Sequence, residues 1–281
     1  MNRMVVIAVL SFGAAFGQTG VAEKPRTPQV KISDVTLDGT VITEMTSAGA
    51  KLATPDEDQP TCIVVHSGGQ RAIGVPIKGE PELLAEALQR QLVTALARGH
   101  YHMTDGRQPP TQLIVFNWGV FTGEGDQTDD PGYRHLLEQA ALIGGVAFAG
   151  ELKHVLEQND LTADAAPVRA WGPQLPGMSS QSMAGLVQST SPLETFRRRS
   201  AKNRQLLDLL SKDCYFVIVS AFDAQSVANG TRQLLWRTKL TSTVRGTSMA
   251  EAVFTLIVRG RDYYGRAMTE AEFLSGKLSE P

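Results

Sequence analysis

The sequence predicts an α/β (α+β) fold: a mixed four-stranded sheet with three parallel strands, one antiparallel edge strand, and helices on both faces. Residues 213–223 are apolar on both alternating faces, a pattern typical of a strand covered by helices on each side. Residues 233–240 alternate more clearly, with Trp236 on one face and Arg237 and Lys239 on the other, as expected of an edge strand with one face in water. An Asn-Gly turn between the two stretches predicts a hairpin.

The other elements are predicted from apolar periodicity and from capping residues. A buried strand at 61–66 leads into a helix that begins near Pro81, and a second buried strand at 113–118 leads into a pair of helices. Capping boxes predict that further helices begin at Ser191 and at Ser248, on either side of the hairpin. Because long helical crossovers connect parallel strands, the first three strands are expected to be parallel and the fourth antiparallel.

The N-terminus has the pattern of a secretory signal peptide. A positive charge at Arg3 precedes a short apolar run at 4–15, and small residues follow up to Gly17. Residues 1–17 are therefore expected to be removed, so that the mature protein begins near Gln18 and is periplasmic or secreted. The competing interpretation is a buried first strand or helix of the mature fold. The rest of the sequence contains no apolar run long enough to span a bilayer.

After this leader, the chain is expected to divide into an arm and one domain. Residues 18–60 are rich in Pro, Thr, Asp and Gly, and we interpret them as an extended arm or linker. Residues 61–281 contain the predicted core elements and are expected to form a single α/β domain. Within it, residues 161–190 have no apolar period, which predicts a long flexible loop that is either functional, for example as a lid, or disordered.

The composition excludes some classes of protein. A net charge of -2 over 281 residues is incompatible with a globally basic nucleic-acid-binding protein, so no nucleic-acid partner is predicted. The two cysteines, Cys62 and Cys214, each begin an apolar run, and they form either a disulfide or two small buried side chains. Without a cluster of further ligands around them they do not predict a zinc site.

Three segments resemble a group of bacterial exported proteins to which no activity is assigned. They are PTQLIVFNWG at 110–119, ALIGGVAFAGEL at 141–152, and DCYFVIVSAFD with QLLWRTKLTSTVRGTSMAEAV within 213–253. The resemblance covers most of the chain after residue 55 and implies export and a single-domain architecture. The order of strands and helices is also similar to small α/β domains of envelope assembly proteins such as the curli-secretion lipoprotein, which by itself implies nothing about function.

Candidate catalytic residues lie at the carboxyl ends of the predicted parallel strands, where open sheets bind ligands. His66 and Asp223 are the candidate acid–base pair there, which a hydrolase would use. Ser67 is a poor nucleophile candidate, because it lacks the Gly-x-Ser-x-Gly setting and neighbours His66 on a strand, where adjacent side chains point to opposite faces. Neither a phosphate-binding glycine motif nor a cofactor site is predicted.

Two basic surfaces are the candidate binding residues. Arg197, Arg198 and Lys202 lie near the start of a predicted helix and could contact an acidic partner or anionic envelope components, although a solvated face is the simpler interpretation. Arg237 and Lys239 lie on the predicted edge strand, where another strand could add. No metal site is predicted.

These observations favour a non-enzymatic, extracytoplasmic module that binds a protein or an envelope component. A hydrolase with its cleft at the strand ends is the alternative, and hydrogen-bond contact between His66 and Asp223 would favour it.

Overall fold

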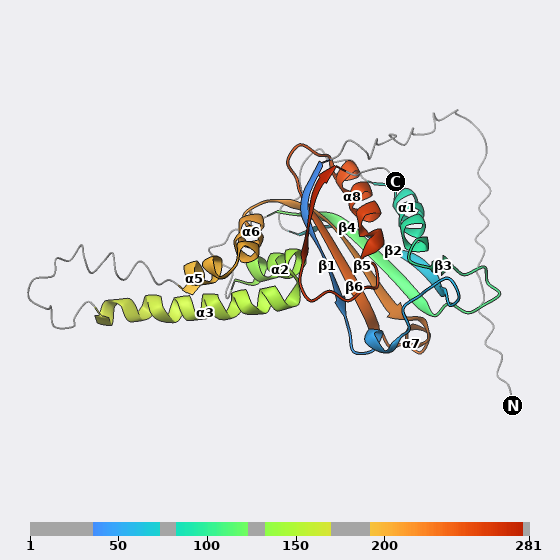
Figure 1. Cartoon of the computed structure of the whole chain (residues 1–281), viewed down its shortest axis with the longest axis horizontal. Helices are drawn as coiled ribbons and strands as arrows, with labels where there is room; N and C mark the ends of the chain where they lie inside the picture. The colour runs from blue at the N-terminus through green and yellow to red at the C-terminus, as the bar shows by residue number, and fades with distance from the viewer. Residues whose placement is uncertain (1–35, 74–82, 123–132, 170–191, 278–281) are drawn as a thin grey trace, which may run out of the picture. The chain divides into compact units, whose positions relative to one another are not determined.

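In the computed structural model, seven strands of the described residues form one mixed sheet in the order β3-β2-β4-β5-β6-β1-β7 (Figure 1). The residues described are 36–73, 83–122, 133–169 and 192–277. The strands are β1 (Thr36–Met45), β2 (Thr61–Ile73), β3 (Tyr101–Met103), β4 (Gln112–Phe121), β5 (Cys214–Asp223), β6 (Leu234–Thr243) and β7 (Glu272–Lys277). The α-helices are α1 (Ala85–Ala97), α2 (Arg134–Ile143), α3 (Gly145–Arg169), α5 (Pro192–Arg199), α6 (Ala201–Leu210), α7 (Ala224–Ala228) and α8 (Met249–Arg259), with 3-10 turns at Gly49–Lys51 and Gly260–Asp262.

The mixed α/β class is confirmed, but the expected four-stranded sheet is wrong. Strands β2, β3 and β4 are parallel to one another, whereas β5 is antiparallel to β4. Cys214 pairs with Phe121, so β5 begins at the end of the sheet where β4 finishes. The helices between these strands therefore return the chain to the same end and do not cross it over to the other.

The expected edge strand is also wrong, because β6 lies inside the sheet. It pairs with β5 on one side and with β1 on the other, and β7 continues the sheet beyond β1. Residues 36–45, which we expected to belong to the extended arm, form β1. The predicted signal peptide at 1–17 lies outside the described residues.

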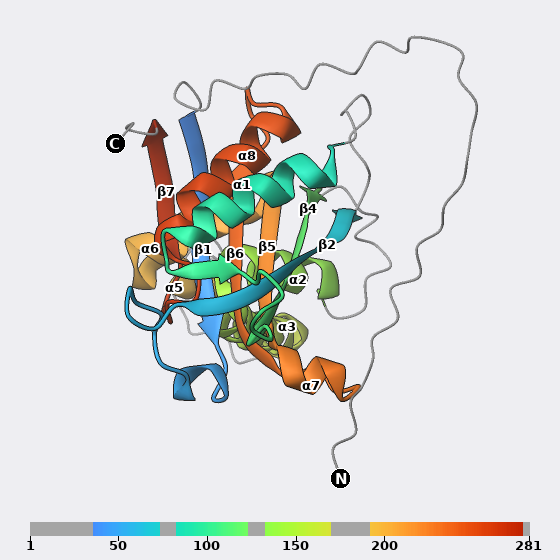
Figure 2. The same cartoon turned by 90° about the vertical axis from the view of Figure 1, so that its right-hand side faces the viewer.

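Helices cover both faces of the sheet (Figure 2). Helices α1 and α8 pack on one face, and α2, α3, α5 and α6 lie on the other. The neighbouring residues Val41 and Ile42 in β1 show the two faces directly, because both are buried but each belongs to a different hydrophobic cluster.

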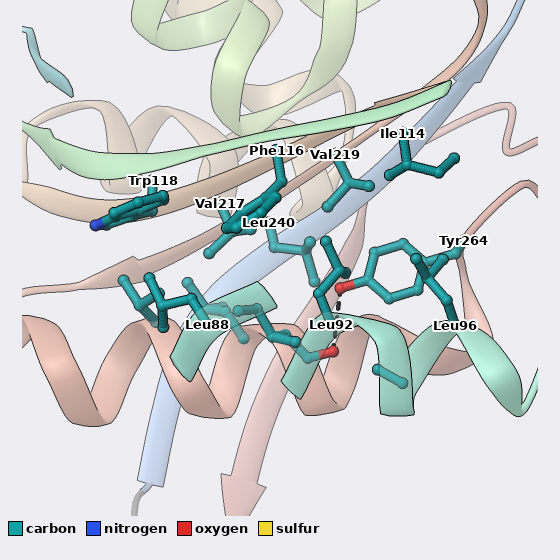
Figure 3. Packing of buried hydrophobic residues seen from close by; sticks show 14 of the residues in the cluster. Leu88, Leu92, Leu96, Ile114, Phe116, Trp118, Val217, Val219, Leu240 and Tyr264 are labelled. Carbon is teal, nitrogen blue, oxygen red and sulfur yellow. Dashed lines mark hydrogen bonds between the residues drawn. The ribbon is translucent and has the colours of Figure 1, made fainter. Parts of the chain in front are cut away.

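The larger cluster lies between the sheet and the α1–α8 pair. The apolar face of α1 contributes Leu88, Leu92 and Leu96, which pack below the aromatic side chains of β4 (Figure 3). Each of these leucines is fully buried, which contributes about 2 kcal/mol per side chain to folding. The Tyr264 hydroxyl donates a hydrogen bond of 3.0 Å to the Ile257 carbonyl of α8, so the one hydroxyl that enters this core from Tyr264 is paired.

On the opposite face, a tight corner joins α2 to α3. Gly145 has a φ of 88°, and a Cβ at that position would lie 2.5 Å from Cδ1 of Ile42, so only glycine fits. Helix α3 then packs against α5, with Phe148 and Leu152 of α3 in the same hydrophobic cluster as Phe196 of α5. It continues to Arg169, so residues 161–169 of the expected loop are helical, and the remainder of that loop lies outside the described residues.

The two cysteines lie near opposite ends of the sheet. Thr111 donates to the Cys62 carbonyl beside the start of β4, whereas Cys214 pairs with Phe121 at its end, which separates the cysteines by about 30 Å along the strands. Both are free thiols, and this distance excludes a disulfide between them. No helix within the described ranges is long and apolar enough to cross a membrane.

Candidate binding surface

The sheet face that carries α2 extends beyond that helix. In Figure 1 the strands continue past α2 and α3 toward α7. We call this surface the open face. It consists of an apolar row, Val64, Leu113, Phe222 and Leu234, and a second row, His66, Val115, Ser220 and Arg237, which we call the polar row because three of its four side chains are polar.

The apolar row is continuous across four neighbouring strands. Val64 pairs with Leu113, Leu113 pairs with Phe222, and Phe222 pairs with Leu234, so the side chains stand about 5 Å apart on one face. All four are half-buried, and none belongs to or packs against the hydrophobic clusters found among the described residues. The row is therefore an apolar strip at the surface of the sheet, not part of its core.

The polar row lies next to the apolar row on the same face. It is displaced from it by two residues along β2, β4 and β5, and by three residues along β6. His66 pairs with Val115, and Ser220 pairs with Arg237. Arg237 donates from Nε to the Ser220 hydroxyl at 3.0 Å, which fixes the guanidinium over β5. Within the described part of the chain, the two terminal amino groups of Arg237 have no acceptor. His66 is exposed at the other end of the row.

A buried ion pair separates the open face from the half covered by α2. Lys239 Nζ lies 2.9 Å from Glu44 Oε2 and donates to the Ala141 carbonyl of α2 at 2.8 Å. Glu44 Oε1 accepts from the Val146 amide at 2.7 Å, which places a carboxylate at the start of α3. Burial lowers the pKa of Lys239, and the hydrogen bond and charge of Glu44 oppose that shift.

This geometry corrects the expectation that Lys239 faces water. Its side chain is 8% exposed, because the strand is internal and α2 lies above it. Lys239 therefore fastens β6 and β1 to the α2–α3 corner. Arg237, two residues earlier on the same face, is half-buried and keeps part of its surface in solvent.

Asn117 stands at the border between the two halves. Its Oδ1 is buried and has no hydrogen-bond partner in the part of the chain that the structure describes. The side chain leans toward β2, where a Cβ on Gly68 would lie 2.3 Å from Oδ1, so the glycine provides the space that the amide occupies.

The candidate catalytic pair is not brought together. His66 pairs with Val115, which in turn pairs with Ser220, whereas Asp223 pairs with Gln112. His66 and Asp223 are therefore three positions apart along the strands and two strands apart, so that their Cα atoms are separated by about 14 Å. The Asp223 carboxylate accepts from the Ser226 amide at 2.6 Å and caps α7. The antiparallel direction of β5 places Asp223 at the opposite end of the sheet from the cleft in which it was expected.

The candidate basic helix start forms ion pairs within the fold. Arg197 contacts Asp208 at 2.9 Å, Arg198 contacts Glu194 at 2.9 Å, and Lys202 pairs with Glu270. The Arg197 pair connects α5 to α6, the Arg198 pair lies within α5, and the Lys202 pair connects α6 to the segment before β7, so each of the three cations has a partner within the fold.

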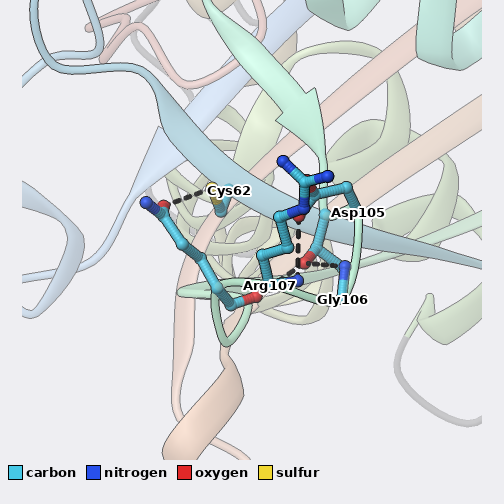
Figure 4. A network of polar contacts seen from close by, with 6 residues as sticks. Cys62, Asp105, Gly106 and Arg107 are labelled. Carbon is cyan, nitrogen blue, oxygen red and sulfur yellow. Dashed lines mark hydrogen bonds and ion pairs between the residues drawn. The ribbon is translucent and has the colours of Figure 1, made fainter.

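His100 and His102 follow α1 and precede Asp105 in the sequence, but these three residues do not form a group that could hold a metal ion. The Asp105 carboxylate is engaged in its own turn, where Oδ1 accepts from the Arg107 amide at 2.9 Å and Oδ2 lies 3.5 Å from Nε (Figure 4). His102 is exposed beside it. Across the described ranges, no group of three or more His, Cys, Asp or Glu side chains could hold a metal ion.

The sequence interpretation missed the apolar row. Val64, Leu113 and Phe222 lie on strands that are apolar on both alternating faces, and this pattern predicts helices on both sides along the whole strand. They stay partly exposed because α2 crosses the strands near the end of β4 and the start of β5 and does not reach the other end of these strands. No sequence pattern within the strands indicates where a covering helix will cross them.

Comparison with known proteins found no matching family model and no matching curated protein. Among solved structures, the chain is similar to the PelC L103M dodecamer from Paraburkholderia phytofirmans, with 12% sequence identity and a TM-score of 0.27. The similarity covers 79% of this chain and 92% of that chain. At this TM-score the similarity carries no argument about function or assembly.

Proposed function

We propose that this protein is a non-enzymatic binding module that acts outside the cytoplasm and binds a protein of the cell envelope on the open face. The observation that supports the proposal is the apolar row of Val64, Leu113, Phe222 and Leu234, which lies side by side at the surface and outside every described core cluster. Contiguous apolar surface of this kind marks interaction sites in soluble proteins, because leaving it in water is unfavourable.

The hydrolase alternative has no comparable support. Its acid–base pair, His66 and Asp223, is about 14 Å apart, too far for a proton to pass between them directly. Asp223 is also committed to capping α7. We therefore retain binding as the proposed function.

A site-specific photo-crosslinker in place of Leu113 tests the proposal in the producing cell. The expected result is one dominant adduct to a partner protein, which then binds the purified full chain. Leu113→Glu should weaken that binding at least about tenfold, because it places a charge in the apolar contact.

The matched control is Leu84, which is 58% exposed next to α1 on the other side of the sheet. Leu84→Glu should bind the partner as the wild type does, and a crosslinker at Leu84 should give a different pattern. Identical adducts from both positions, or equal binding by both glutamate variants, would rule out the open face as the binding surface.

Export is a separate part of the proposal and needs its own measurement. N-terminal sequencing of the protein from the extracytoplasmic fraction should begin near Gln18. An intact Met1 on protein from the cytoplasm would contradict the proposed location without bearing on the open face.

A further inference from the structure

We propose that the open face receives an amphipathic helix of the partner protein, and that this helix presents a carboxylate to Arg237. The inference rests on the proposed function and narrows the partner to one kind of surface: an apolar helical stripe with an acidic residue beside it.

The position of the apolar row excludes the addition of a strand at this site. Leu113 and Phe222 lie on β4 and β5, which are inside the sheet and pair with neighbours on both sides. Their backbone groups are already used, so a partner can contact only side chains and must satisfy its own backbone hydrogen bonds. A helix does this within itself, and an extended peptide does not.

The neighbouring half of the same face shows how a helix fits. Helix α2 crosses the strands, from His135 beside Phe121 of β4 to Ile143, whose carbonyl accepts from Thr40 of β1. The apolar row also runs across strands, over four strands or about 15 Å. A helix of about ten residues spans that distance, with apolar side chains at i, i+3, i+4 and i+7 over the row.

The charge on the open face selects an acidic partner. The Nε of Arg237 is held by Ser220, and the two terminal amino groups point to no described acceptor. The nearest carboxylate in register, Glu44, is already engaged by Lys239 and by the Val146 amide. Covering Arg237 with an apolar surface would leave its charge desolvated and unpaired, whereas a carboxylate can accept both amino groups at once.

Selection from two displayed peptide libraries on the immobilised full-length chain tests this inference. One library presents helices of about 18 residues with randomised surface positions, and the other presents proline-containing extended peptides of the same length. The expected result is enrichment from the helical library alone, with apolar residues at i, i+3 and i+4 and an Asp or Glu next to them.

A charge swap then tests the contact with Arg237. Arg237→Glu should weaken a selected acidic peptide about tenfold or more, and changing the peptide carboxylate to Lys should restore binding to this variant but not to the wild type. Arg198→Glu is the matched control, because Arg198 is an exposed arginine on α5 away from the open face. Unfolding curves of both variants verify that the fold is retained.

Three outcomes overturn the inference: enrichment of extended peptides, helices without a carboxylate, or acidic helices that bind Arg237→Glu as well as the wild type. None of them removes the proposed function, which the Leu113 crosslinker tests separately. If the Leu113 crosslinker instead joins only to other residues of the same chain and no peptide is enriched, the occupant is the chain itself and both proposals are wrong.

Discussion

The two halves of the sheet face that carries α2 can be compared through two phenylalanines of one strand. Phe216 and Phe222 both lie on β5 and point to the same face. Phe216 is fully buried beneath α2, whereas Phe222 is half-buried in the apolar row. Both halves contain large apolar strand residues, although the open half also carries His66, Ser220 and Arg237. The burial of a phenylalanine on this face is therefore decided by where α2 crosses the strands, and large apolar side chains beyond that crossing stay partly exposed.

Truncation of each phenylalanine in turn is expected to give the largest difference in stability between the two halves. Phe216→Ala should lower the free energy of unfolding by about 3–5 kcal/mol, because it leaves a cavity under α2. Phe222→Ala should lower it by about 1 kcal/mol or less, since its neighbours and solvent already share that space. Urea denaturation of both variants gives the difference. Equal losses would mean that the open face is covered in the folded chain.

A second, smaller loss of stability is expected when the ion pair between the two halves is removed. Lys239→Met should lower the free energy of unfolding by about 2 kcal/mol, because Glu44 loses its charge partner, although the 27% exposure of Glu44 moderates the cost. Arg237→Met should change it by about 0.5 kcal/mol or less, because this side chain is partly in solvent. A double-mutant cycle of Lys239→Met with Glu44→Gln isolates the pair, and an absence of coupling would show that Lys239 acts only by packing.

Helix α8, on the opposite face of the sheet, is expected to make a pH-dependent contribution to stability. Hydrogen bonds from the Ser248 backbone amide and hydroxyl lower the pKa of Glu251, the acidic member of the capping box of α8. A lowered folded pKa means that its contribution is complete above the ordinary value of 4.5 and is lost as the pH falls through the folded value.

Glu251→Gln should therefore lower the free energy of unfolding by about 1 kcal/mol at neutral pH and by progressively less as the pH falls. Chemical denaturation at several pH values checks this slope. A difference that stays constant below pH 4 would show that the charge of Glu251 does not contribute to the cap.

The smallest effects are expected at the exposed ion pairs of α5 and α6. Arg198→Ala and Lys202→Ala should each change the free energy of unfolding by about 0.5 kcal/mol or less, as surface pairs generally do. They should also leave peptide binding to the open face unchanged. A clear loss of partner binding in either variant would return the basic helix start to the list of binding surfaces.

The sequence predicted those elements whose pattern depends on near neighbours. The hairpin of β5 with β6 is confirmed by their antiparallel pairing, and the capping box at Ser248 begins α8 as expected. The helix expected to run from Ser191 to about residue 210 is instead divided at Ser200, whose side chain caps α6 by accepting from the Asn203 amide. A single serine within a helical pattern does not reveal such a break.

Strand β1 was missed because threonines flank its two buried apolar residues, Val41 and Ile42, so that the segment has no clear apolar pattern. Thr40 and Thr43 are almost completely buried, and each pairs with a threonine of β6 at 2.8 Å, namely Thr241 and Thr238. Two hydroxyls that satisfy one another across strands can be buried at little cost, but each alone has the composition of a loop. The long-range pairing that buries them cannot be inferred from either segment by itself.

The open face was missed for the opposite reason. Val217 and Ile218 lie on the two alternating faces of the strand predicted at 213–223, both of which were expected to be covered by helices, and the structure separates them. Val217 is fully buried against α1 and α8, whereas Ile218 is half-buried at the border of the open face. Alternation assigns two faces to a strand, but it does not say how far the covering helix extends.

The two cysteines differ in burial, so that a thiol reagent can label one of them selectively. Burial, with a smaller effect from Asp213, raises the pKa of the Cys214 thiol to about 12, so that this sulfur is neutral and inaccessible to an alkylating reagent at neutral pH. Cys62 is half-buried at the start of β2, two residues before Val64 on the same face, and its thiol donates to Gln108 Oε1 at 3.6 Å. A thiol-directed dye should therefore label the native protein at one position, next to the apolar row, where its emission would report the arrival of an occupant without any change to the sequence.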